Sequence, residues 1–202
     1  ASTAKSGTEP AETLCALGNA SRAVGKLSEA YDFYGEALRR DPSDADALLG
    51  IARINKQEGR QKLNVSLLSP YAAEYADHIV FQKMLGNAYI ADGNIEKAIE
   101  TFHHLDYISN DTAAKEPLAW TLTLVGDYDN AAIFFEEAAG GDVSENFLIK
   151  KGIMQWLSGD RRAALDTLAQ VRGKTTQSVF ETSFGSLSAA TGDAGIKAGL
   201  ML

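Results

Sequence analysis

Four side chains in this sequence could bind a transition metal or act as a nucleophile or general base: Cys15, His78, His103 and His104. A metal site needs several such ligands whose side chains converge on one point. His103 and His104 are adjacent, so on a helix they point in different directions and make a poor pair of ligands. Cys15 has no histidine near it in the sequence, and the simpler interpretation is a small, half-buried residue. We therefore expect no metal site and no nucleophile.

Sequence motifs for catalysis are missing as well. No stretch has the glycine pattern of a phosphate-binding loop or a dinucleotide fold, the H-E-x-x-H pattern of a zinc protease, or the acidic loop of an EF-hand. Acidic pairs such as Glu136–Glu137 are interpreted as solvated helix faces. The sequence predicts a protein that is not an enzyme and that carries no cofactor.

The composition narrows the class of protein further. With 202 residues, 45% of them hydrophobic, the chain can form a substantial core. The net charge is −8 and no run of Lys or Arg exceeds two residues, so no nucleic-acid partner is expected. A single cysteine excludes an intrachain disulfide, and no apolar run approaches the roughly 20 residues of a membrane span. The first ten residues, ASTAKSGTEP, are small and polar, and we expect a flexible lead-in there.

A glycine recurs at nearly constant spacing along the chain. These glycines are Gly25, Gly59, Gly93, Gly126, Gly159 and Gly192, at intervals of 34, 34, 33, 33 and 33 residues. Five residues after the glycine, four copies have alanine: Ala30, Ala98, Ala131 and Ala164. Nine residues after it, five copies have a large apolar residue: Tyr34, Leu68, Phe102, Phe135 and Leu168. Apolar residues three and four apart on both sides predict a helix, a turn at the glycine and a second helix.

Each repeated residue type has a physical reason. A glycine can end the first helix in a left-handed conformation that other residues adopt at a cost. The alanines let two helices approach closely, and the large residue fills the space beside them. One helical hairpin cannot bury its apolar face alone, so neighbouring hairpins must stack.

The sequence therefore predicts an all-α fold, a right-handed α-solenoid that forms a single domain over residues 11–202. The predicted repeats span residues 11–44, 45–78, 79–111, 112–144, 145–177 and 178–202. Pro42 is expected to end a second helix, after which Ser43 or Asp44 caps the next one. In the second repeat Asn64 replaces the small residue and Pro70 should break the helix, whereas Pro117 fits the first turn of its helix. The sixth repeat is truncated, and its extra glycines favour a short, frayed helix or cap.

This order of residues resembles the tetratricopeptide repeat (TPR), whose pattern is W-x2-L-G-x2-Y, then A-x3-F, then P. The third repeat has LGNAY at 85–89 followed by Gly93, Ala98 and Phe102, and the first has LGNAS at 17–21 followed by Ala30 and Tyr34. The resemblance covers residues 11 to about 202. Ankyrin repeats share the period, but their T-P-L-H-x-A signature is absent.

The resemblance implies that a partner peptide or helix binds in a concave groove lined by the first helix of each repeat. The groove positions that it implies are Asn19, Arg22, Arg53, Lys56, Lys83, Asn87, Ile90, Trp120, Ile149, Ile153 and Trp156. The cations lie in the first three repeats and the tryptophans in the next two. A partner segment with acidic residues at one end and apolar anchors at the other would suit this order.

Two alternatives stay open at this point: the tryptophans could belong to the core between repeats, and the cations could be ordinary surface charge. Cochaperone TPR domains hold a C-terminal carboxylate with lysine, asparagine and arginine side chains. Lys83 and Asn87 match the first pair of that clamp, but Pro117 or Leu118 stands where an asparagine is needed. We therefore expect no complete carboxylate clamp.

The stretch SEAYDFYGEALRRDPSDADALLGIARI, residues 28–54, resembles TPR subunits of bacterial envelope assembly machines. Among these it looks most like the TPR lipoproteins of tight-adherence (Tad) pilus systems, which are thought to assist the outer-membrane secretin. That similarity implies a pilotin-like accessory factor in the assembly of a bacterial pilus or secretion system, with a secretin or another subunit as its partner. It also implies a periplasmic protein held at the outer membrane by a lipid anchor preceding Ala1. The alternative interpretation is a cytosolic TPR chaperone or regulatory adaptor.

Overall fold

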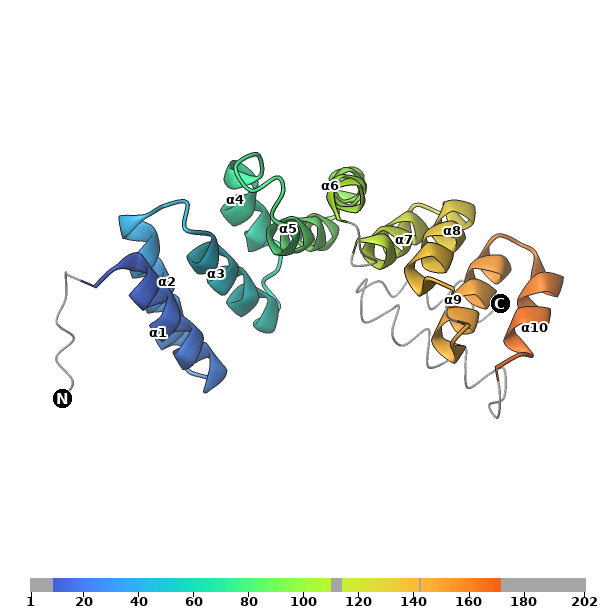
Figure 1. Ribbon diagram of the computed structural model, residues 1–202, viewed down its shortest axis with the longest axis horizontal. Coiled ribbons are helices and arrows are strands. Elements are labelled where there is room, and N and C mark those ends of the chain that lie inside the picture. Colours follow the sequence, from blue (N-terminus) through green and yellow to red (C-terminus); the bar gives the residue numbers. More distant parts are fainter. Residues whose placement is uncertain (1–8, 110–113, 142, 172–202) are drawn as a thin grey trace. The chain divides into compact units, whose positions relative to one another are not determined.

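A computed structural model of the protein describes residues 9–109, 114–141 and 143–171 (Figure 1). These residues form α-helices and one short 3-10 helix, with no β-strand among them. The helices divide into an N-terminal unit, Ala1–Asp92, and a C-terminal unit, Gly93–Leu202, which are described separately. The prediction of an all-α fold is confirmed.

The N-terminal unit is built from two helical hairpins and the first helix of a third. It contains α1 (Ala11–Ala23), α2 (Leu27–Arg40), α3 (Ala45–Gln57), α4 (Leu63–Leu68), the 3-10 helix η1 (Ser69–Tyr71) and α5 (Ile79–Asp92). α1 and α2 pack against each other, and α3 packs against both. α5 packs against α3 and α4, so α1, α3 and α5 follow one another across the unit (Figure 1).

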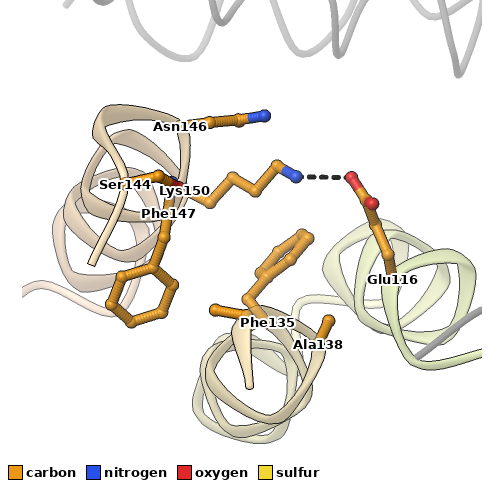
Figure 2. Close-up of a pocket in the computed structure, with 8 residues that line it drawn as sticks. Glu116, Phe135, Ala138, Ser144, Asn146, Phe147 and Lys150 are labelled. Carbon is orange, nitrogen blue, oxygen red and sulfur yellow. Dashed lines mark hydrogen bonds and ion pairs between the residues drawn. The ribbon is translucent and has the colours of Figure 1, made fainter. Parts of the chain in front are cut away.

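The C-terminal unit continues the same alternation of helices. It contains α6 (Ile95–Ile108), α7 (Lys115–Leu124), α8 (Tyr128–Ala139), α9 (Glu145–Leu157) and α10 (Arg161–Leu168). Each helix packs on the next one along the chain. The ring of Phe135 on α8 lies between α7 and α9 (Figure 2).

The first helix of each described repeat ends one or two residues before the glycine that the spacing predicted. Gly25, Gly59, Gly93, Gly126 and Gly159 have φ angles between 71° and 95°, the left-handed region that a side chain disfavours. Gly192 and the sixth repeat lie outside the described residues, and so does the lead-in up to residue 8. The four repeated alanines are fully buried, as expected for close helix approach.

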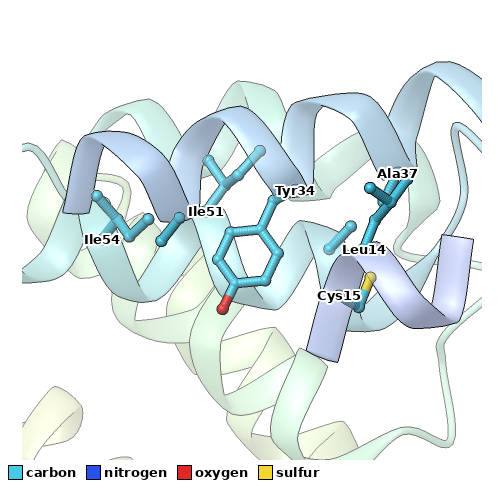
Figure 3. Packing of buried hydrophobic residues seen from close by; sticks show 8 residues of the cluster. Leu14, Cys15, Tyr34, Ala37, Ile51 and Ile54 are labelled. Carbon is cyan, nitrogen blue, oxygen red and sulfur yellow. The ribbon is translucent and has the colours of Figure 1, made fainter. Parts of the chain in front are cut away.

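The core of the N-terminal unit is arranged around Tyr34 on α2, which Figure 3 shows among the neighbouring apolar side chains. Its ring is fully buried and lies against the backbone of Gly18 on α1 and Gly50 on α3. A Cβ on Gly18 would come within 2.6 Å of the ring, and a Cβ on Gly50 within 2.4 Å. The two glycines therefore provide the space that the aromatic ring occupies.

The second repeat departs from the pattern and compensates for it. Asn64, which replaces the small residue, is 1% exposed. Its Oδ1 accepts a hydrogen bond from Asn55 Nδ2 at 2.7 Å, and its own Nδ2 donates to the carbonyl of Ala52 at 3.0 Å. A buried polar pair thus ties α4 to α3 where four other repeats use an alanine.

The prolines and the capping residue act as predicted. α2 ends at Arg40 before Pro42, and Asp44 caps α3 by accepting from the N–H of Ala47 at 2.8 Å. α4 ends at Leu68, and the chain continues in η1, which contains Pro70. Pro117 lies in the first turn of α7. None of the described helices is long and apolar enough to cross a lipid bilayer.

Candidate partner-binding site

Four basic side chains lie along the first helices of the N-terminal unit. We call them the basic face: Arg22 on α1, Arg53 and Lys56 on α3, and Lys83 on α5. Most of α3 is buried, and Arg53 and Lys56 belong to the part of its surface that stays accessible. Since α3 packs against both α1 and α5, the basic face extends over three adjacent helices.

The cations of the basic face have no side-chain partner among the described residues. None of the four makes a side-chain hydrogen bond or ion pair with another residue that the structure describes. Elsewhere in the described chain most cations are paired: Lys26 lies 3.1 Å from Glu29, for example. The Nε–H of Arg22 is buried and lacks an acceptor. A buried donor left unpaired carries a desolvation cost that a ligand oxygen would remove.

The polar and apolar residues expected beside these cations are partly accessible. Asn19, one turn before Arg22 on α1, is exposed, and its Oδ1 accepts a hydrogen bond from the Tyr34 hydroxyl at 2.9 Å. That bond holds the amide in one orientation, with Nδ2 as its remaining donor group. Asn87 and Ile90 on α5 are both half-buried.

The first helices of the C-terminal unit carry their charge differently. Lys150 on α9 reaches across to Glu116 on α7, with 2.5 Å between Nζ and Oε1, and lies 5.6 Å from the centre of the Phe135 ring (Figure 2). Its side chain is only 17% exposed. These groups border a shallow hollow of about 200 Å³ lined by Glu116, Phe135, Ala138, Ala139, Ser144, Asn146, Phe147 and Lys150. Here the cation is neutralised within the protein.

The apolar groove residues expected in this unit fall into two groups. Trp120, Ile149 and Trp156 are half-buried. The Trp120 ring packs edge-on against Phe135 at a centroid distance of 4.6 Å, and the Arg161 guanidinium lies 5.3 Å from the Trp156 ring. Ile153 is only 1% exposed, because that side of α9 faces the core. The expectation that Ile153 lines an accessible groove is therefore corrected.

Cys15 is buried beside acidic groups, which makes it unreactive. Its thiol is 4% exposed and donates to Asp44 Oδ1 at 3.4 Å. Burial, followed by the hydrogen bond and charge of Asp44 and the charge of Asp46, raises the pKa of the Cys15 thiol to about 12. A thiol that stays protonated at neutral pH is a poor nucleophile.

The histidines have structural contacts. His78 Nδ1 accepts from the N–H of Phe81 at 3.2 Å, at the start of α5. The His103 ring meets Phe134 edge-on at 5.8 Å. Within the described residues, no group of His, Cys, Asp and Glu side chains is placed to hold a metal ion.

Sequence reasoning missed the ion pairs between neighbouring repeats. Glu116 on α7 and Lys150 on α9 lie on the first helices of consecutive repeats, one residue away from the same repeat position. Lys115 on α7 bridges Asp106 on α6, in the preceding repeat, at 3.0 Å and Glu137 on α8, in its own repeat, at 2.6 Å. For Glu116 and Lys150 the repeat period was the available signal, because residues about one period apart lie on the first helices of neighbouring repeats.

Two segments of the chain match known family models. Residues 13–46 and residues 84–112 each match a model described as tetratricopeptide repeat. No curated protein matches the chain. The two segments are the first and third repeats, where the sequence pattern was clearest. TPR repeats are typically interaction modules rather than catalytic ones.

Solved structures share the fold at low sequence identity. MamA is 16% identical with a TM-score of 0.72, over 87% of this chain and 94% of that chain. YrrB, described as a TPR protein with an unusual peptide-binding site, is 18% identical with a TM-score of 0.67, over 91% and 87%. PilF of Pseudomonas aeruginosa is 18% identical with a TM-score of 0.63, over 90% and 88%. Two segments of the chain therefore match the tetratricopeptide repeat, and the described fold is the α-solenoid that these solved structures share.

Proposed function

We propose that this tetratricopeptide-repeat chain is a non-enzymatic scaffold that binds a segment of a partner protein on the first helices of its repeats. The observation that supports this most is the basic face. Its cations lie on adjacent first helices and lack partners among the described residues, whereas most other described cations are paired. Groups left unsatisfied in the free protein are the ones that a partner can satisfy on binding.

We further propose that the partner belongs to a bacterial pilus or secretion system, as a secretin or another subunit, and that this chain acts as a pilotin-like accessory factor. Two observations support the proposal: the sequence resembles TPR lipoproteins of tight-adherence pilus systems, and the fold is similar to that of PilF. The corresponding location is the periplasmic side of the outer membrane. A cytosolic chaperone or regulatory adaptor would use the same repeats on a different partner.

Site-specific photo-crosslinking in the native host tests the binding face. A photoreactive amino acid replaces Lys56, which is exposed on a first helix, or Lys62, which is exposed at the start of a second helix. We expect a crosslinked partner from position 56 and none from position 62, because only the former lies on the proposed face. Equal crosslinking at both positions, or none at either, would contradict the proposal.

The same experiment separates the two proposed settings. Mass spectrometry identifies the crosslinked protein, and cell fractionation locates this chain. A pilus or secretion subunit together with a membrane fraction would support the accessory role. A cytosolic client in a soluble fraction would support the chaperone or adaptor role instead of the accessory role. It would not contradict the scaffold function.

A further inference from the structure

We propose that the basic face binds an extended internal segment rich in Asp and Glu, and that it requires no free C-terminus in that segment. This inference rests on the proposed scaffold function and specifies the chemistry of the partner. It concerns the N-terminal unit alone.

The charge distribution of the chain indicates an acidic partner. The chain has a net charge of −8, and most of the described cations outside the basic face are neutralised nearby, as with Lys115, Lys150 and Lys151. The basic face keeps its charge although acidic side chains are abundant in the sequence. Unpaired positive charge on three adjacent helices is complementary to a row of carboxylates.

The hydrogen-bond donors of the basic face fit an extended peptide with carboxylate side chains. Arg22 offers a buried Nε–H without an acceptor, and Arg53 is half-buried. Guanidinium groups match the two oxygens of a carboxylate, and a partly buried guanidinium loses less to solvent screening. Asn19 and Asn87 lie one turn from Arg22 and Lys83, so amide groups alternate with cations along the face. Amides of this kind can hydrogen-bond the main chain of an extended peptide between its acidic side chains.

The neighbouring residues favour protein over nucleic acid. Exposed carboxylates, Glu12 on α1 and Asp46 on α3, stand on the same two helices as Arg22 and Arg53. A continuous phosphate backbone would meet these negative charges, whereas a peptide can place neutral residues opposite them. A segment with separated carboxylates therefore fits the face better than a polynucleotide.

Fluorescence anisotropy on the full chain tests the inference with a defined probe. The probe is a labelled Glu-Ser repeat of roughly ten residues, about 33 Å long when extended, with an amidated C-terminus. The comparison ligands are the same peptide with a free C-terminus, a Gln-Ser repeat and single-stranded DNA of similar length. We expect both acidic peptides to bind equally, the Gln-Ser repeat not to bind, and DNA to bind more weakly.

The variants test whether binding belongs to the face. The double variant Arg22→Gln with Arg53→Gln should lower the affinity for the Glu-Ser peptide by roughly tenfold or more. The matched control, Lys62→Gln with Arg162→Gln, removes the same charge from exposed cations away from the face and should leave affinity unchanged. If Arg22→Gln lowers stability, Lys56→Gln, at an exposed position, provides the same comparison in a folded chain.

Three results would overturn the inference: no binding of the acidic peptide, an equal loss of peptide affinity in both double variants, or tighter binding of DNA than of the acidic peptide. A requirement for the free C-terminus would overturn the internal-segment part. These failures are distinguishable from failure of the scaffold function, because a protein crosslinked at position 56 would still show a partner on the same face.

Discussion

At the scale of single residues, glycine serves two separate purposes in this protein. Gly25 and its equivalents adopt positive φ angles at the end of a helix, where no side chain crowds them. Gly18 and Gly50 lie inside helices, and each makes room for the Tyr34 ring. A glycine inside a helix costs stability relative to alanine, so the second group is kept for packing.

Substituting two helical glycines should therefore have opposite effects. Gly50→Ala places a methyl group 2.4 Å from the Tyr34 ring and should lower the free energy of unfolding by about 1–3 kcal/mol. Gly35→Ala, in α2 with nothing within 4 Å of its Cβ, should raise it by up to about 1 kcal/mol. Urea denaturation followed by circular dichroism measures both. Equal stability of Gly50→Ala and the parent would mean that Tyr34 does not occupy this position.

The buried thiol gives a second prediction at this scale. Cys15 should react slowly with a disulfide reagent in the native protein at pH 8 and rapidly in urea, because its folded-state pKa is about 12. In the unfolded chain the thiol loses its proton near the ordinary value of 9.0, and in the folded chain it does not. The stability contribution of Cys15 therefore falls as the pH rises from 9 towards 12. Cys15→Ala should lack this part of the pH dependence, and an identical profile would contradict the assignment.

At the scale of elements, α4 shows how one repeat tolerates a departure from the pattern. The helix has only six residues and ends before Pro70. Its contact with α3 uses the Asn64–Asn55 hydrogen bond instead of a small apolar residue. Both side chains are buried, so each depends on the other for a partner.

A double-mutant cycle tests this dependence. Asn55→Ala and Asn64→Ala should each lower the free energy of unfolding by about 1–3 kcal/mol, because each leaves a buried amide without its partner. The double variant should cost less than the sum of the two, since neither amide remains. Strict additivity in chemical denaturation would show that the two side chains act independently.

The two tryptophans of the C-terminal unit should differ in what they contribute. Trp120 packs against the buried Phe135, whereas Trp156 is half-buried against the Arg161 guanidinium. We expect Trp120→Ala to lower the melting temperature more than Trp156→Ala, and both to weaken binding of a partner that uses this unit. Thermal denaturation and partner titration of the two variants decide this. A larger thermal loss for Trp156→Ala would reverse the assignment.

At the scale of the whole molecule, the two units treat positive charge differently. The first helices of the N-terminal unit carry cations with no partner among the described residues, whereas Lys150 on α9 is neutralised by Glu116 on α7. Sequence reasoning could locate the charges on first helices but could not decide which would be paired.

This difference predicts that partner binding weakens as salt is added. The Debye length falls from about 10 Å at 0.1 M to about 3 Å at 1 M, so a partner held through the basic face loses affinity over that range. Titrations of the partner at several salt concentrations measure how steeply the affinity falls as salt is added. The Arg22→Gln and Arg53→Gln variant should show a shallower slope than the parent, and an unchanged slope would count against the basic face.

Periodicity explains how much of the structure could be predicted. The glycine spacing placed the helix ends, and Pro70 was correctly expected to interrupt its helix. The burial of Ile153 was missed, because burial depends on how α9 meets its neighbours, and one position can face outward in one repeat and inward in another. The pairing of charges was missed for the same reason: it depends on contacts between neighbouring helices.

The position of Tyr34 has a consequence for how the N-terminal unit unfolds. One ring contacts a glycine of its own repeat and a glycine of the following repeat, so it contributes to the interface term as well as to the intrinsic stability of the first hairpin. In a nearest-neighbour description of a repeat protein, a residue that stabilises the interface between two repeats makes those repeats unfold more cooperatively. Native-state hydrogen exchange should find α1, α2 and α3 opening together in the parent, and α1 and α2 opening separately from α3 once Gly50 carries a methyl group.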